Sequence, residues 1–168
     1  MATIGRDNIT GLGSNSRTNS DPHFIQSGIN TYTPSGAETL TEVGFHCGTN
    51  YGAIEVGVYR TDTLAKIASA TVTATAANTR TAASVSGSLS AGVTYAVAWR
   101  TIDANVDYQT TYADSAGSRD STRNGSTALQ NTFNDTLEGL TSEWAVFATT
   151  TASSAPVLTS GMLLRGIG

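Results

Sequence analysis

Charged residues are scarce in this 168-residue chain, and lysine is nearly absent. Lys66 is the only lysine, and Asp, Glu, Lys and Arg together make up 13% of the residues, about half of the usual share. Disordered chains are rich in charge, whereas helical bundles and coiled coils are built from Ala, Glu, Lys, Leu and Arg. The composition therefore argues against all of these classes.

Clusters of basic residues are missing as well. The eight arginines are scattered along the chain, and the formal net charge is −4 at pH 7. Binding to nucleic acid normally rests on the neutralisation of phosphates by clustered Arg and Lys. We therefore expect no direct contact with DNA or RNA.

Cysteine occurs once, at Cys47, so no disulfide can form within the chain. The longest apolar runs have five residues, far short of a membrane crossing. The N-terminal sequence MATIGRDNIT has neither the basic region nor the apolar region of a secretory signal. We therefore expect a protein that is made in a cytosol and does not contact membranes.

Histidine occurs only twice, at His23 and His46, which restricts the available chemistry. Zinc sites need three or four converging ligands, and neighbours on a strand point to opposite faces. We therefore interpret Cys47 as a small buried side chain and His46 as a residue on the opposite face. Neither a GxSxG motif nor a phosphate-binding glycine motif occurs. The acids are isolated and are interpreted as solvated charges, so we expect no catalytic residue, no metal site and no cofactor.

Threonine, alanine, serine and glycine are the commonest residues, and apolar positions follow a period of two from about Phe24 to Thr150. Much Thr, Val, Tyr and Gly with little Glu and Lys favours strands and turns. Four stretches predict half-buried strands, apolar inside and polar outside. The predicted inner sets are Thr39, Thr41, Val43, Phe45 and Cys47; Ile54, Val56 and Val58; Ala70, Val72 and Ala74; and Ala83, Val85, Gly87 and Leu89.

Two further stretches, Val93 to Ile102 and Trp144 to Ala148, are apolar on both faces. We expect central strands that are covered on both sides. Turn signals such as Pro34-Ser-Gly separate the strands, and residues 128–142 are ambiguous, with room for a short helical turn. Strands of this length and spacing predict an all-β fold, a single antiparallel β-sandwich.

The two ends of the chain show no clear period. We predict an irregular N-terminal arm at residues 1–22, a β-sandwich domain at residues 23–150 and a C-terminal tail at residues 151–168. The tail either adds an edge strand to the sheet or docks on a partner, and both interpretations stay open. The predicted partner contacts are the apolar residues of the two ends: Ile4, Ile9, Leu12, Val157, Leu158, Met162, Leu163 and Leu164.

Aromatic residues make up 7% of the chain and suggest two roles. Trp99 and Trp144 are predicted to fill the core because of their large apolar area. Tyr51, Tyr108 and Tyr112 are candidate ligand-facing residues, because aromatic faces stack on sugar rings. They would act with the polar loop at residues 114–127, since loops of this length in a compact domain are usually functional or mobile.

The segment Leu89-Ser-Ala-Gly-Val-Thr-Tyr95 resembles a corner of the β-sandwich modules found in bacterial surface proteins and in virion proteins of tailed bacteriophages. In those modules a Leu closes one strand, a Gly takes the turn and a Tyr opens the next strand. The stretches Val56 to Arg60 and Ala68 to Val72 resemble a hairpin of the same modules, and Phe24-Ile-Gln-Ser-Gly28 fits their opening. The resemblance covers roughly residues 24–150.

The single module, the irregular ends and the lack of evident catalytic chemistry favour the phage proteins among these modules. The resemblance implies a jelly-roll-like sandwich and a homotrimer, with other virion proteins as partners. We therefore expect a structural virion protein, made in the host cytoplasm, that decorates or cements an assembled head and is not an enzyme. The alternative is a carbohydrate- or receptor-binding module of a phage tail or fibre.

Overall fold

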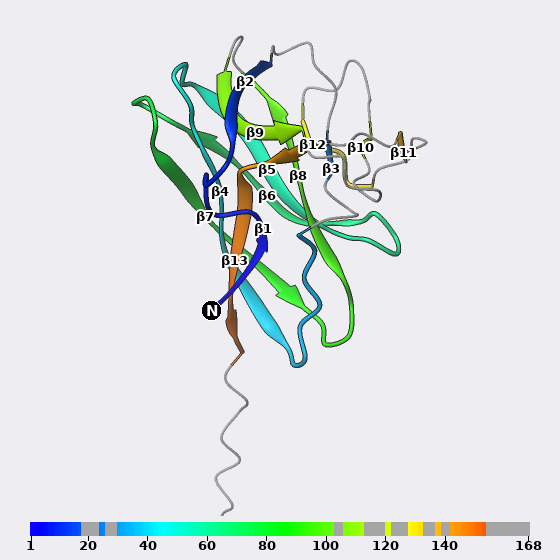
Figure 1. Ribbon diagram of the computed structural model, residues 1–168. Helices are drawn as coiled ribbons and strands as arrows, with labels where there is room; N and C mark the ends of the chain where they lie inside the picture. The colour runs from blue at the N-terminus through cyan, green and yellow to red at the C-terminus, as the bar shows by residue number, and fades with distance from the viewer. Residues whose placement is uncertain are drawn as a thin grey trace, which may run out of the picture.

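The computed structural model describes residues 1–17, 24–25, 30–102, 106–112, 120–121, 128–132, 137–138 and 142–153. Over these residues the chain is all-β, without a helix, and two antiparallel sheets pack against each other (Figure 1). The predicted fold class, a single antiparallel β-sandwich, is confirmed. The short helical turn that residues 128–142 had room for does not occur in their described part.

Each of the two main sheets has four strands. The first sheet has the order β1-β13-β4-β7 and consists of β1 (Ala2–Gly5), β13 (Val146–Ala152), β4 (Glu38–His46) and β7 (Arg80–Leu89). The second sheet has the order β3-β8-β5-β6 and consists of β3 (Phe24–Ile25), β8 (Tyr95–Thr101), β5 (Ala53–Arg60) and β6 (Lys66–Thr73).

The other five described strands form two small sheets. The three-stranded sheet has the order β12-β9-β2 and consists of β12 (Ser142–Trp144), β9 (Val106–Tyr112) and β2 (Gly13–Arg17). A two-stranded ladder pairs β10 (Asp120–Ser121) with β11 (Leu137–Glu138).

The eight main strands have the order of a jelly roll. Counted along the chain, the first sheet takes the first, eighth, third and sixth of them, and the second sheet takes the second, seventh, fourth and fifth. The chain therefore crosses between the sheets at every step except the β5–β6 hairpin, as in a jelly roll built from two Greek keys.

The strands β2, β9 and β12, which are inserted between main strands, gather at one end of the sandwich (Figure 1). Phe45 near the end of β4 pairs with Val146 at the start of β13, and Ile54 pairs with Thr101 at the end of β8. The connections after β1, β4, β6 and β8 consequently share this end. Figure 1 shows β2, β9 and β12 at this end.

The core lies between the main sheets and follows most of the predicted alternation. Phe45 of β4 and the following Cys47 face it, together with the predicted inner sets of β5 and β6 and with Leu89 of β7. Trp99 and Trp144 are fully buried, and their rings meet edge to face with centroids 5.4 Å apart. The predicted core role of both tryptophans is confirmed.

The alternation fails at the start of β4. The register of β4 against both of its neighbours shifts between Leu40 and Glu42. Such a bulge changes which face the following side chains occupy. Leu40 is therefore fully buried in the core, whereas the Thr41 hydroxyl donates to the carbonyl oxygen of Thr149 at 3.1 Å. The prediction of Thr39 and Thr41 as inner residues is wrong.

Three strands are covered on both faces rather than the expected two. The sheet order places β8 and β13 between other strands, which confirms both predicted central strands. Residues 53–59 of β5 are also all buried, although the sequence predicts one polar, solvent-facing side for them. Leu129 packs beside Gly57 on the outer face of the second sheet, and this covers the predicted exposed side of β5.

The prediction of an irregular arm is wrong for residues 2–5 and for residues 13–17. Residues 13–17 form β2, which pairs with β9. Residues 2–5 form β1, which pairs with β13, and Ile4 is fully buried in the core. Gly5 then turns the chain with a φ of +79°, and its N–H donates to the carbonyl oxygen of Asn30 at 2.7 Å. Ile4 thus belongs to the core of its own chain and is not a partner contact.

The corner at Leu89 to Tyr95 has the geometry that the resemblance implies. Leu89 and Tyr95 are both 1% exposed, and Gly92 takes the turn with a φ of +73°. The Ser90 N–H donates to the Tyr95 hydroxyl at 2.8 Å. The expected hairpin also forms, with Val56 opposite Ala70. This agreement concerns architecture alone.

The C-terminal strand ends just before the part of the chain that the structure leaves undescribed. β13 runs to Ala152, and the Ser153 N–H donates to the carbonyl oxygen of Ala37 at 3.0 Å. The remaining predicted contacts of the tail lie outside the described residues: Val157, Leu158, Met162, Leu163 and Leu164.

Candidate functional site

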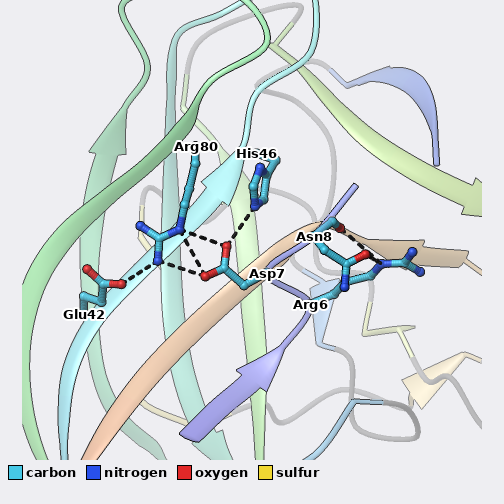
Figure 2. Close-up of polar contacts among 6 residues, drawn as sticks. All are labelled: Arg6, Asp7, Asn8, Glu42, His46 and Arg80. Atoms are coloured by element: carbon cyan, nitrogen blue, oxygen red, sulfur yellow. Dashed lines mark hydrogen bonds and ion pairs between the residues drawn. The ribbon is translucent and has the colours of Figure 1, made fainter. Parts of the chain in front are cut away.

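Four ionisable side chains meet on the outer face of the first sheet (Figure 2). His46 and Arg80 are directly opposite each other in the β4–β7 ladder, and Glu42 lies on the same face of β4. Asp7 reaches them from the segment that follows β1. We call this group the Asp7 cluster: Asp7, Glu42, His46 and Arg80.

Asp7 accepts hydrogen bonds on both of its carboxylate oxygens. Arg80 binds it in bidentate fashion, with Nε to Oδ1 and Nη2 to Oδ2 both at 2.9 Å. The His46 Nε2 lies 2.8 Å from Oδ1, and Arg80 also donates to Glu42 at 2.6 Å. Burial raises the pKa of Asp7, but the bonds from Arg80 and His46 outweigh it, so the pKa lies below its ordinary value of 3.8.

Phe147 forms the apolar floor of the Asp7 cluster. It is fully buried, and the Arg80 guanidinium lies 4.1 Å from the ring centroid, within the range of a cation–π contact. The His46 ring centroid is 5.9 Å away. Gly44 pairs with Phe147 and leaves the space that the ring fills, since a Cβ there would come within 2.5 Å of the ring. The cluster therefore covers Phe147 and ties the segment after β1 to the sheet.

Among the described residues, the Asp7–His46 pair has no nucleophilic side chain hydrogen-bonded to its imidazole. A nucleophilic site places the imidazole next to a Ser or Cys as well as an acid. Over the described part of the chain, the one side chain that hydrogen-bonds to His46 is Asp7. Cys47 points into the core and is 1% exposed, which confirms the predicted opposite faces of His46 and Cys47. Among the described residues, no group of His, Cys, Asp or Glu is arranged to hold a metal ion.

A polar hollow of about 450 Å³ opens beside the Asp7 cluster. Arg6 lies on its wall, and Figure 2 shows the Arg6 side chain turned away from the cluster toward Asn8, to which Nε donates at 3.2 Å. Small-molecule sites are mostly apolar with a few polar groups. This hollow has the opposite character, so it is a weak candidate for a ligand site. Its lining residues are Thr3, Gly5, Arg6, Asp7, Asn8 and Asn30.

A second polar network lies on the outer face of the second sheet and is centred on Glu55. Its carboxylate accepts hydrogen bonds from Ser69 Oγ at 3.0 Å, Arg100 Nε at 3.0 Å and the Leu129 N–H at 2.7 Å. The Glu55 and Arg100 side chains are each 11% exposed. Burial raises the pKa of Glu55, but the three hydrogen bonds outweigh it and hold the pKa below its ordinary value.

Residues 128–132, which we call the strap, are fixed to β5 and β6 by this network and by three more hydrogen bonds. Lys66, the only lysine, donates through Nζ to the carbonyl oxygen of Leu129 at 2.7 Å and through its N–H to that of Asn131 at 2.8 Å. The Tyr59 hydroxyl donates to Gln130 at 2.6 Å, and burial raises the pKa of this tyrosine, which keeps it a donor. One feature of the sequence indicates a partner for β5. Glu55 is the only acid in this apolar strand, and a buried carboxylate needs hydrogen-bond donors such as the Leu129 N–H.

The three candidate ligand-facing tyrosines belong to the end where the inserted segments gather. Tyr51 lies in the connection between β4 and β5 and is 56% exposed. Tyr108 and Tyr112 are in β9, where they pair with Asn15 and Ser142. Their side chains lie outside the part of the chain that the structure describes, so only Tyr51 is shown to face solvent.

The remaining two predicted partner contacts lie between β1 and β2. Ile9 is 40% exposed, which makes it one of the few large apolar side chains on the described surface. Leu12 is half-buried, and its N–H donates to the carbonyl oxygen of Ile9 at 3.0 Å. Of the two, Ile9 is the more exposed.

Compared with known protein families, with curated proteins and with solved structures, the chain shows no match. Among the described residues there is no helix of the length and apolarity that a bilayer crossing requires.

Proposed function

We propose that this chain is a structural virion protein that binds the surface of an assembled phage head. The observation that carries the proposal is the jelly-roll order of the eight main strands, an architecture that recurs in viral capsid domains. This support is an analogy between architectures, and the same architecture also serves other functions. The sequence resemblance to phage virion modules points the same way, and a homotrimeric state and a place on the virion are part of this proposal.

The proposed mechanism is thermodynamic. A protein that binds the assembled shell and not its loose subunits stabilises the shell, by about 4 kcal/mol per site when its free concentration is a thousand times the dissociation constant. The sandwich supplies a rigid body for this role, because β5, β8 and β13 are buried on both faces. Ile9 is one of the large apolar side chains that are exposed on the described surface, with Met1 and Tyr51, and it is the one we propose for such a contact.

The test begins with purified particles of the phage that encodes the chain. An antibody against the chain should label the heads, and heads assembled without the chain should release their DNA at a lower temperature. Particles that lack the chain, or that carry it on the tail alone, would contradict the proposal.

Point variants then test the contact itself. Deletion of residues 1–22 is unsuitable, because it removes β1 and the core residue Ile4. Ile9→Asp keeps β1 and should reduce incorporation into heads, whereas the neighbouring Thr10→Asp adds the same charge at an exposed polar position. Equal incorporation of both variants would exclude Ile9 as a contact.

A sugar-binding function is the second candidate, because Tyr51 is exposed in the connection between β4 and β5. Jelly rolls also occur in lectins. A glycan array tests this candidate, with Tyr51→Ala to remove the ring and Tyr51→Phe to retain the stacking face. Saturable binding that is lost in the first variant and kept in the second would favour a carbohydrate-binding module. A head-binding protein should show no saturable binding to any glycan.

A further inference from the structure

The first sheet ends at β7, and the second sheet ends beside it at β6. Among the described strands, β7 pairs with β4 alone, and an edge strand offers N–H and C=O groups to an additional strand. We call the surface that the two edges form the seam: residues 67–73 and 81–89. The cations that begin the two strands, Lys66 and Arg80, already bind carbonyl or carboxylate groups of the same chain.

The core is less completely closed at the seam than elsewhere. Seven apolar residues pack against the main core while remaining partly exposed, and five of these belong to β6 and β7. A segment that covers them removes apolar surface from water, which is stabilising by roughly 25 cal/mol per Å². The five residues are Ile67, Ala68, Ala70, Ala83 and Val85.

The sequence that follows Ser153 has the composition of a covering segment. Residues 154–168 carry one charge, at Arg165. Soluble proteins rarely leave a large group of apolar side chains in water. Pro156 precedes these side chains and has no N–H to give to a ladder, which suits a connection and not a paired position. The large apolar residues are Val157, Leu158, Met162, Leu163, Leu164 and Ile167.

The course of the first sheet directs this segment toward β7. β4 is antiparallel to both β13 and β7, so β13 and β7 run in the same direction. A chain that turns back after β13 is therefore antiparallel to β7, which is the pairing that a short connection permits. The two strands also end at the same level, because Glu38 of β4 is opposite both Ala152 and Leu89.

The chain is long enough for this course. A strand added to the outer edge of β7 would lie three strand spacings from β13, about 14 Å. Extended residues span at most about 3.5 Å each, so residues 154–157 can bridge this distance. Residues 158–167 then match the length of β7, which runs from Arg80 to Leu89.

We infer that residues 158–167 add a strand to β7 of the same chain and thereby cover the seam. The uncharged seam suits other neutral segments as well, but a tethered segment is present at an effective concentration on the order of 1 mM. A free partner competes with it only at a similar concentration. The contact lies within one chain, so it does not depend on binding to a phage head.

The test links the tail to one or the other edge of the first sheet in the full-length chain. Ser160→Cys is combined with Ser86→Cys on β7 or with Thr3→Cys on β1, both at exposed positions. Thr3 is level with Ser86 across the sheet, and β1 lies next to β13, from which the tail leaves. Cys47 is buried and does not compete for the reagent.

A short bismaleimide should link the tail to Ser86→Cys within one chain, because a strand that starts beside Leu89 brings Ser160 close to Ser86. The link to Thr3→Cys should be absent. Denaturing gels and mass spectrometry distinguish links within a chain from links between chains. Equal yields at the two edges would overturn the inference, as would the lack of a link at β7. Links that join two chains would also overturn it, because the segment would then cover another copy.

A second comparison tests the apolar basis of the contact. Neighbours on a strand point to opposite faces, so Leu163→Asp with Leu164→Asp puts a charge against the core side in either register. This pair of substitutions should abolish the link to Ser86→Cys. Ser154→Asp with Ala155→Asp adds the same charge to the connection and should keep the link. A link that persists in the first pair would overturn the inference. Circular dichroism shows that each variant is folded, and the comparison of the two edges is decisive without the aspartate variants.

Discussion

Asp7 and Glu55 each fasten a distant chain segment to the outer face of a sheet. Asp7 joins the segment after β1 to Arg80 on β7, and Glu55 on β5 accepts the N–H of Leu129 in the strap. In both cases a partly buried carboxylate is surrounded by donors, which compensates for its loss of hydration. Both carboxylates therefore help to hold the fold together.

Removal of the Glu55 carboxylate tests the strap network. Glu55→Ala should lower the free energy of unfolding by about 3–5 kcal/mol, because Arg100 then stays buried without its carboxylate partner. Urea denaturation measures this change. Asp62→Ala breaks an exposed pair with Arg60 and should leave the midpoint where it is in the wild type. Equal midpoints for the two variants would mean that the network does not stabilise the strap.

Acid should weaken the attachment of the segment after β1. The folded-state pKa of Asp7 lies below its ordinary value of 3.8, so the unfolded state binds more protons than the folded state over the interval between the two values. The stabilisation by Asp7 is therefore complete above the unfolded pKa and disappears as the pH falls through the folded pKa.

The free energy of unfolding should accordingly change little above about pH 5 and fall below about pH 4. Asp7→Asn lacks the titrating carboxyl group, so its stability should start lower and should decline less with acid. Urea midpoints measured across this pH range give both curves. Parallel curves for the variant and the wild type would show that Asp7 contributes nothing to the acid sensitivity.

At the scale of elements, β1 shows how little local sequence is needed when a sheet provides the partner. Its four residues pair with β13, and Ile4 enters the core between the sheets. A short isolated segment pays the full entropy of ordering, but an edge position beside an existing strand supplies backbone partners and burial at once. The polar composition of residues 1–22 does not indicate this strand, because a single apolar residue, Ile4, is sufficient to anchor it in the core.

Truncation of Ile4 separates the core strand from an arm that contacts a partner. Ile4→Ala should lower the free energy of unfolding by about 2–5 kcal/mol, as for other fully buried aliphatic residues. Ile9→Ala, at a side chain that is 40% exposed, should change it by no more than about 0.5 kcal/mol. Thermal unfolding of the two variants gives the comparison, and similar losses for both would place Ile9 in the core as well.

The strap and the bulge of β4 belong to the same scale. The strap covers the outer face of β5, so a strand with one polar side is buried on both faces. The bulge near Thr41 changes which residues face the core, so Leu40 lies inside. In both cases contacts with other segments, and not the local alternation of apolar and polar residues, decide which side chains are buried.

At the scale of the whole molecule, the two main sheets share one core and are joined by crossing connections. Trp99 belongs to the second sheet, and Trp144 is in β12, next to the start of β13 in the first sheet; the two rings touch in the core. Strands that are adjacent in a sheet are mostly distant along the chain. Neither sheet can therefore keep its buried face when the other is lost.

Unfolding should consequently be a single cooperative transition. Tryptophan fluorescence, which reports on the shared core, and far-ultraviolet circular dichroism, which reports on strands, should give the same urea midpoint. The same experiment on Ile4→Ala should shift both signals together. Two separate midpoints would show that the sheets unfold independently.

The sequence by itself determined the class of fold, the inner faces of β5, β6 and β7, both central strands β8 and β13, and the opposite faces of His46 and Cys47. These features follow from the local period of two and from the burial of one face, which neighbouring residues report directly. Only the tertiary structure decided the jelly-roll order, the place of Ile4, and the partners of Asp7 and Glu55. Arg80 lies 73 positions from Asp7, and Leu129 lies 74 from Glu55. Such pairs are set by which distant segments the packed sheets bring together, and no local pattern records that choice.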